Sequence, residues 1–347
     1  MNPRAALLAA MALLCPGCFS ASYLAQAARG ELQILYRARP IREVVADPEV
    51  PERVRLLLSS VAVVKAFGER NGLAPTGNYD RYSDLGRAAA VWVVQGCAPL
   101  SFDVRHWRFP LVGTIPYLGF FHREAAQRYA RELARREAID VDVRGAGAFS
   151  TLGWFSDPVL STMIAPGDEA LGELANAILH ESLHATLYVN DQSPFDESLA
   201  SFVADRLTVA WLETVLGPGA PQTRAWIEAD ELHRVQVARI HAAYLELDAL
   251  YRSDSSAQRK REEKARILEE LRVELHAARP LNNASIADYK SYDSGGPAFE
   301  RLLAACDGSW PRFLRALRAL SPSDFQRPQQ EAFDGVVDRL AQRGCAP

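Results

Sequence analysis

The sequence has few cysteines, no surplus of basic residues and no long apolar run, and each shortage narrows the possible functions. Lys and Arg number 39 against 43 Asp and Glu, which gives a net charge of -4. A nucleic-acid-binding surface needs clustered basic residues, so we expect no nucleic-acid partner. After residue 18, no stretch reaches the length of about 18 uninterrupted apolar residues that marks a membrane-spanning helix.

Only three of the five cysteines lie after residue 18: Cys97, Cys306 and Cys345. None has the spacing of a metal site, and three cysteines allow at most one internal disulfide. We favour a pair between Cys306 and Cys345 because both lie in the C-terminal part of the chain.

Residues 1–18 have the pattern of an export signal. Arg4 precedes an apolar run over residues 5–14, which is too short to cross a bilayer. The run ends in the letters LCPGC, which resemble the lipobox of bacterial lipoproteins, although the CP pair departs from the usual pattern. We expect Cys18 to carry the lipid that holds the mature protein at a membrane, facing the periplasm. Phe19 is not the Asp that retains lipoproteins in the inner membrane, so the outer membrane is favoured. The alternatives are an ordinary signal peptide or a buried N-terminal helix.

The remaining chain predicts an α+β fold that is mainly α. Short β-branched or aromatic runs predict strands at 90–94, 140–143 and 148–155, which would form a small sheet beside the helix described next. Helical periodicity is found in many longer segments, at 19–39, 51–71, 121–137, 197–216, 223–252, 257–278, 298–319 and 324–343. We expect one domain over residues 19–347, with a helical hairpin at 223–278 as a subdomain.

The segment His180-Glu181-Ser182-Leu183-His184 is an H-E-x-x-H motif within a predicted helix. Residues at i and i+4 lie on one helix face, so His180 and His184 can bind the same ion. Glu181 lies beside that ion, where it can act as the base for the attacking water. The alternative is that both histidines are ordinary residues of a helix surface.

A catalytic zinc site usually has three protein ligands and one open position. Glu197 follows His184 after a predicted turn at 190–194, so a second helix can return its carboxylate to the histidines. We therefore predict one zinc ion, with His180, His184 and Glu197 as its ligands.

Further site residues are predicted around these ligands. Ligand histidines are usually held by an outer carboxylate or carbonyl, for which Asp196 and Asp205 are candidates. The oxyanion of the reaction needs a second donor, and we predict Tyr289 and Tyr292, with Tyr188 as another candidate. The segment Thr151, Leu152 and Gly153 can pair with the substrate backbone as an edge strand. For these acids, tyrosines and strand residues, the alternative is a purely structural role.

Several motifs in one order resemble the predicted zinc aminopeptidase family of bacterial lipoproteins. They cover nearly the whole mature chain: the lipobox with residues 25–32, then 79–87, 109–113, 116–121, 150–158, 180–184, 195–198 and 282–284. The resemblance implies a zincin-like fold and a zinc peptidase with His180, His184 and Glu197 as ligands and Glu181 as base. The chain departs from the family pattern at Ser182-Leu183 and at Asp196, and neither departure removes a ligand.

We therefore expect a zinc-dependent peptidase, with an aminopeptidase favoured. An aminopeptidase needs a carboxylate for the free amine of its substrate. The Gly-x-Met-Glu-Asn motif of well-known zinc aminopeptidases is absent, and Asp157 or Glu173 could replace it. Two other functions stay open: a zinc amidase that acts on a cell-wall peptide, and a non-catalytic lipoprotein with a structural zinc.

Overall fold

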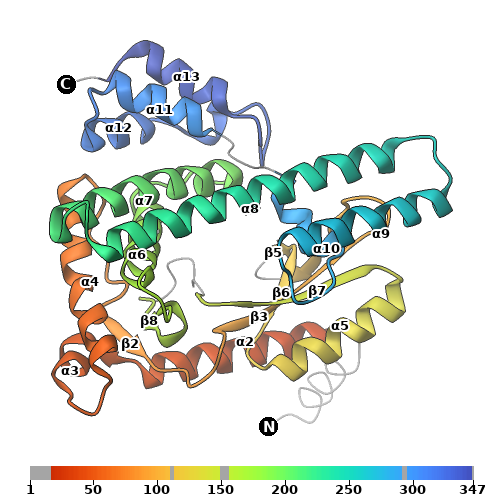
Figure 1. The fold of residues 1–347 in the computed structure, drawn as a ribbon, viewed down its shortest axis with the longest axis horizontal. Helices are drawn as coiled ribbons and strands as arrows, with labels where there is room; N and C mark the ends of the chain where they lie inside the picture. Colours follow the sequence, from red (N-terminus) through yellow and green to blue (C-terminus); the bar gives the residue numbers. More distant parts are fainter. Residues whose placement is uncertain (1–16, 110–112, 149–155, 291–294, 346–347) are drawn as a thin grey trace, which may run out of the picture. The chain divides into compact units, whose positions relative to one another are not determined.

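The computed structural model describes residues 17–109, 113–148, 156–290 and 295–345 (Figure 1). It divides into two compact units. The first unit comprises Met1–Ala38, Ser83–Phe149 and Ala242–Asp288. The second comprises Arg39–Tyr82, Ser150–His241 and Tyr289–Pro347. Each unit is thus assembled from three separate stretches of sequence.

The first unit contains a three-stranded antiparallel sheet in the order β6–β3–β7. Its strands are β3 (Val91–Cys97), β6 (Tyr117–Phe120) and β7 (Asp140–Ala146). Val94 lies opposite Leu118 in β6 and Val143 in β7. Helix α5 (Arg123–Glu137) contributes Ala126, Ala130 and Leu133 to the core that covers this sheet. The same unit also contains the short strands β4 (Trp107–Phe109) and β5 (Gly113–Ile115), which pair in antiparallel fashion.

Helix α2 (Gly17–Arg37) packs against strand β6 in the same unit. The amide of Gln26 donates to the carbonyl of Gly119 at 3.0 Å, and the Gly119 N–H donates to the Tyr23 hydroxyl at 3.0 Å. In the described part of the chain, no helix has both the length and the apolar character to cross a membrane.

Two long helices form the predicted hairpin, α8 (Pro221–Arg252) and α9 (Ala257–Glu274), as Figure 1 shows. The turn between them falls at 253–256, where the Ser256 side chain caps α9 by accepting the Arg259 N–H. Arg266 of α9 pairs with Glu246 of α8 at 3.5 Å. The division between the two units falls within α8, between His241 and Ala242.

A polar cluster that we call the asparagine node lies after this hairpin, where helix α10 (Asn283–Ile286) begins. Asn282 caps α10, and its amide donates to the carbonyl of Val141 at 3.0 Å. The fully buried Asn283 donates to the carbonyls of two residues and to Asp140, and its side-chain oxygen accepts from the Tyr251 hydroxyl at 2.7 Å. All the polar groups of the Asn283 side chain are therefore satisfied within the fold.

The second unit has a small sheet of its own, in the order β1–β2–β8: β1 (Arg39–Pro40), β2 (Arg81–Ser83) and β8 (Val159–Leu160). Its core includes residues of α3 (Ile41–Ala46), α4 (Glu52–Arg70), α6 (Ala170–Thr186) and α7 (Ser193–Leu216), together with residues of α8 and of the three helices described next. A Cβ on Gly172 of α6 would lie 2.6 Å from the ring of Trp226, so only glycine allows this close contact.

Three short helices follow in this unit: α11 (Gly296–Ala305), α12 (Trp310–Leu317) and α13 (Asp334–Arg343) (Figure 1). The predicted single helix at 298–319 is broken because Asp307 and Gly308 adopt positive φ values of 57° and 71°. Phe299 of α11 contacts Phe195 of α7, with ring centroids 5.9 Å apart.

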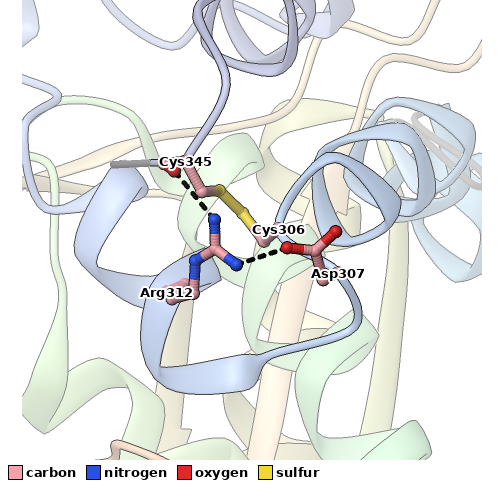
Figure 2. Close-up of a disulfide and its surroundings, with 4 residues drawn as sticks. All are labelled: Cys306, Asp307, Arg312 and Cys345. Carbon is pink, nitrogen blue, oxygen red and sulfur yellow. Dashed lines mark hydrogen bonds and ion pairs between the residues drawn. A yellow bond between two sulfur atoms is a disulfide. The ribbon is translucent and has the colours of Figure 1, made fainter. Parts of the chain in front are cut away.

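Cys306 and Cys345 form a disulfide, as the sequence favoured, with their Cα atoms 5.0 Å apart (Figure 2). Arg312 donates to the carbonyl of Cys345 at 2.9 Å and pairs with Asp307. Cys97 is buried and free. The bridge joins the ends of α11 and α13 and fixes the group of short helices.

The mainly helical α+β class is confirmed, and the predicted strands at 90–94 and 140–143 pair directly as β3 and β7. These strands belong to the first unit, whereas the motif helix α6 belongs to the second. The predicted strand at 148–155 falls largely outside the described residues.

Candidate metal centre

The two histidines of the motif lie on one face of α6, and the third candidate ligand begins the next helix. Helix α6 ends at Thr186, and Leu187 closes it with an N–H bond to the carbonyl of Leu183. Helix α7 begins at Ser193, four residues earlier than predicted, with Pro194 in its first turn. Glu197 therefore lies near the start of α7, where it can face back toward α6.

The turn between α6 and α7 is fixed by hydrogen bonds from the C-terminal part of the chain. The buried Gln192 donates to the carbonyl of Arg327 at 2.9 Å and accepts from the N–H of Gln330 at 3.1 Å. Asp191 has φ 61° and accepts from the N–H of Gln329 at 2.7 Å. Glu197 is thus held in place by a rigid turn.

Three side-chain donor atoms converge in this arrangement. His180 Nε2 lies 3.2 Å from His184 Nε2 and 3.3 Å from Glu197 Oε2. His184 Nε2 lies 3.6 Å from Glu197 Oε1. Together with Glu181, we call these residues the HExxH centre.

The donor set fits a zinc ion. Two imidazole nitrogens and a carboxylate oxygen are ligands that Zn²⁺ accepts, and ligand distances of about 2.0–2.1 Å in a tetrahedral site separate the donor atoms by about 3.3 Å. The three measured separations agree with that value, from 3.2 to 3.6 Å. Within the described residues, these three form the group that could hold a metal ion. Their role as ligands stays a prediction.

The charges around Glu181 are those expected near a reactive centre. Burial raises the pKa of Glu181, and the charges of Glu197 and Asp157 act in the same direction against those of His180 and His184. Hydrogen bonds from both histidines hold the pKa of Glu197 well below its usual range. Burial lowers the pKa of His184, but the hydrogen bond and charge of Glu197 outweigh it and raise the pKa overall.

The two predicted outer acids lie near different histidines. The charge of Asp196 acts on the pKa of His184, and the charge of His180 acts on the pKa of Asp205. Asp205 accepts from the amide of Asn176 at 2.8 Å. Asp196 accepts from the Val189 N–H at 2.9 Å through Oδ1, while its Oδ2 and the Nδ1 of His184 are buried and have no hydrogen-bond partner in the part of the chain that the structure describes. Burial raises the pKa of Asp196 to about 6.

The predicted tyrosine donors have different surroundings. The Tyr289 carbonyl accepts from His241 Nδ1 at 2.7 Å, and in the described part of the chain no hydrogen bond or ring contact joins Tyr289 to the HExxH centre. Tyr292 lies outside the described residues, as do Thr151, Leu152 and Gly153. The ring of Tyr188 lies edge-on to His184, with centroids 6.4 Å apart, and is exposed. Cys18 is in the first turn of α2.

Tyr79 is a site residue that the sequence analysis did not identify. It is 5% exposed, and the charges of Glu181 and Asp157 join burial in raising its pKa well above the usual range. Its backbone has a φ of 66°, which is rare for an aromatic residue and persists only when the surroundings enforce it. In the sequence, Tyr79 belongs to the motif at 79–87, but no spacing relates it to Glu181.

A cleft of about 1,080 Å³ opens beside Glu197. Its floor is α7, and its walls come from the first half of α8 and from α11, all within the second unit. The arginines in the cleft are paired with acids, Arg206 with Glu300 and Arg234 with Asp230. Of the residues of the HExxH centre, Glu197 lines this cleft.

Comparison with known proteins gives one clear match. A family model described as "Putative aminopeptidase" matches residues 22–332, which include the whole HExxH centre. Neither the curated proteins nor the solved structures gave a significant match. The description of the family supports a peptidase. Because the match covers most of the sequence, the chain belongs to this aminopeptidase family.

Proposed function

We propose that the protein is a zinc-dependent peptidase of zincin-like fold that removes residues from the amino end of peptides. The observation that carries the proposal is the triangle of donor atoms formed by His180, His184 and Glu197, with Glu181 beside it. A zinc ion bound there would supply a Lewis acid for the substrate carbonyl and lower the pKa of a bound water to near neutral.

The residues of the chain then have distinct tasks. Glu181 takes the proton of the attacking water and passes it to the leaving amine. Its raised pKa suits this exchange because a base works best when its pKa is near the working pH. The cleft beside Glu197 accommodates the peptide.

Tyr79 is our candidate for the second donor to the oxyanion. Its hydroxyl makes no hydrogen bond to any described residue, and its raised pKa keeps the proton in place, so it can donate to a developing negative charge. The charge of Glu181 acts on its pKa, which is consistent with a place near the reaction. Tyr289 and Tyr292 remain the candidates from the sequence.

The test compares the purified wild-type protein with Glu181→Gln, for zinc content and for cleavage of a mixed peptide library. We expect one zinc ion per chain in both proteins and a loss of activity of about 10²- to 10⁴-fold in the variant. Zinc in both proteins without cleavage in either would favour a non-protein amide substrate or a structural zinc. Absence of zinc from both would contradict the proposal.

The attachment of the protein to a membrane is a separate proposal. We propose that a lipid on Cys18 holds the enzyme at the outer membrane, facing the periplasm. Mass spectrometry of the full-length protein from a bacterial host would detect an acylated Cys18 as the new N-terminus, and an unmodified or differently cleaved chain would contradict it.

A further inference from the structure

Gln192 is the residue at which helix α7 begins, and a segment far along the chain holds its side chain. Its backbone carbonyl accepts the Asp196 N–H at 3.0 Å, at the start of α7. Its side chain is 1% exposed and bonds to the backbone of Arg327 and Gln330. Because Glu197 lies near the start of the same helix, the side-chain bonds of Gln192 help to determine where this candidate ligand is held.

A cluster of phenylalanine rings holds the same end of α7. Phe195, two positions before Glu197, is fully buried. Its ring contacts those of Phe299, Phe325 and Phe333, with centroids 5.9, 5.4 and 5.4 Å away. Aromatic pairs at such separations stabilise a structure beyond the area they bury. The start of α7 is therefore both packed against the C-terminal part of the chain and hydrogen-bonded to it.

The disulfide between Cys306 and Cys345 closes a loop that contains most of these contacts (Figure 2). The bridge spans 39 positions and encloses residues 325–333, which supply two of the rings and both partners of the Gln192 side chain. Arg301 of α11 pairs with Asp338 of α13 at 2.8 Å and joins the two helices at a second point. A disulfide limits the freedom of the residues within its loop, so it restrains the 325–333 segment.

The 325–333 segment has internal hydrogen bonds as well. The Gln330 side chain is 7% exposed, accepts from the Gln326 N–H at 2.7 Å and donates to the Ala332 carbonyl at 2.6 Å. A movement of this segment would therefore displace the partners of Gln192 together. All of these residues belong to the second unit, as does the HExxH centre.

We propose that Gln192 is a positioning residue that links the disulfide-closed segment to the metal centre, so that the bridge between Cys306 and Cys345 raises the affinity for zinc. The inference rests on the zinc site proposed above. Without the bridge, the 325–333 segment separates from α7 more often, and the Glu197 carboxylate must then be ordered when the ion binds. Ordering a ligand during binding costs conformational entropy and lowers the affinity.

The experiment measures metal binding by full-length variants through competition with a chelator. Gln192→Leu should weaken zinc binding by about 10- to 100-fold, as does the loss of other groups that hold metal ligands. Cys306→Ala/Cys345→Ala should weaken it by about three- to tenfold, because the bridge acts on the ligand less directly than Gln192 does. The three substitutions together should cost well below the product of the two losses, because effects that pass through one residue are not additive.

A second readout separates positioning from stability alone. Co²⁺ replaces zinc in the same proteins, and its absorption spectrum reports the arrangement of the ligands. The matched control is Gln95→Leu, since Gln95 is also a fully buried glutamine with both ends of its side chain bonded, to Asp288 and Arg144 of the first unit. We expect an altered Co²⁺ spectrum for Gln192→Leu, and the wild-type spectrum and zinc affinity for Gln95→Leu.

The outcomes distinguish this inference from the proposed function. Wild-type zinc affinity and Co²⁺ spectrum in a folded Gln192→Leu protein would overturn it, as would an equal loss of affinity in Gln95→Leu. Losses that multiply fully in the combined variant would overturn the shared route through Gln192. If Gln192→Leu fails to fold, the cysteine variant decides, because a zinc affinity equal to that of wild type overturns the role of the bridge. A wild type that binds zinc without cleaving peptides contradicts the peptidase function only, whereas one that binds no metal contradicts the zinc site itself.

Discussion

The HExxH centre and the asparagine node are both polar, but they differ in how their hydrogen bonds are satisfied. In the node, Asn283 uses both its amide and its carbonyl oxygen, and Tyr251 donates to it. At the centre, His184 Nδ1 and the Oδ2 of the neighbouring Asp196 are buried without a hydrogen-bond partner among the described residues. A buried polar group that is satisfied stabilises a fold, whereas one without a partner is costly, and a ligand that supplies the missing bond offsets that cost.

The largest expected effect comes from removing one of the proposed zinc ligands. Glu197→Ala should lose zinc and reduce kcat/KM by more than about 10³-fold, because the Lewis acid is worth several kcal/mol. The zinc-free forms of wild type and variant should differ in stability by less than about 1 kcal/mol, since the Glu197 side chain is 65% exposed. Metal analysis and urea unfolding measure both quantities. Full activity and zinc content in the variant would exclude Glu197 as a ligand.

Two tyrosines allow a direct comparison between the regions. Tyr79→Phe should reduce kcat by about 10²-fold with little loss of stability, because it removes a donor that the fold does not use. Tyr251→Phe should leave kcat unchanged and lower the free energy of unfolding by about 1 kcal/mol, because it removes a buried hydrogen bond. Steady-state kinetics and urea unfolding of both variants provide the test. A normal kcat for Tyr79→Phe would assign the oxyanion donor elsewhere, with Tyr188→Phe as the next variant.

A substitution in the asparagine node should lower the stability of the protein and leave its activity unchanged. Asn283→Ala removes several buried hydrogen bonds and leaves Tyr251 and two carbonyls without their partner, so we expect a loss of about 3 kcal/mol. Zinc content and kcat of the folded fraction should remain those of wild type. A selective loss of activity would show that the node contributes to catalysis.

The smallest expected effect comes from Asp196, one of the two predicted outer acids. Asp196→Asn should weaken zinc binding by about 10- to 100-fold, because its charge supports His184. The substituted side chain keeps an oxygen for the Val189 N–H, so the stability of the zinc-free protein should hold. Competition with a chelator measures the affinity. An unchanged affinity would make Asp196 a structural residue, and Asp205→Asn would then test the other acid.

The sequence predicted the elements of the fold well where local rules decide them. Helical spacing placed His180 and His184 on one face, and the turn residues before Pro194 correctly separated α6 from α7. The pair Cys306–Cys345 also followed from position alone. The helix face and the turn depend on residues close together in sequence, and the disulfide follows because few cysteines remain to pair, so a single sequence is enough to predict them.

Features that depend on contacts between residues far apart in sequence could not be predicted in this way. Asn282 and Asn283 form a polar motif before Tyr289, which made a place near the reaction plausible, but their bonds to Val141, Ala98 and Ser101 give them a structural role. Tyr79 and Asp157 are joined by bonds across 78 positions, and no periodicity reports such a pair. The division of the chain into two interleaved units is likewise a property of three-dimensional contacts.

The bonds that fix the turn before Glu197 also have a consequence for protein synthesis. Gln192 is held by the carbonyl of Arg327, which lies 135 positions later in the chain. During translation, α6 and α7 emerge long before the segment that sets the turn between them. The turn that sets the spacing of the three donor atoms is therefore complete only after residues 327–330 have left the ribosome, so the proposed metal would be loaded late in the maturation of this protein.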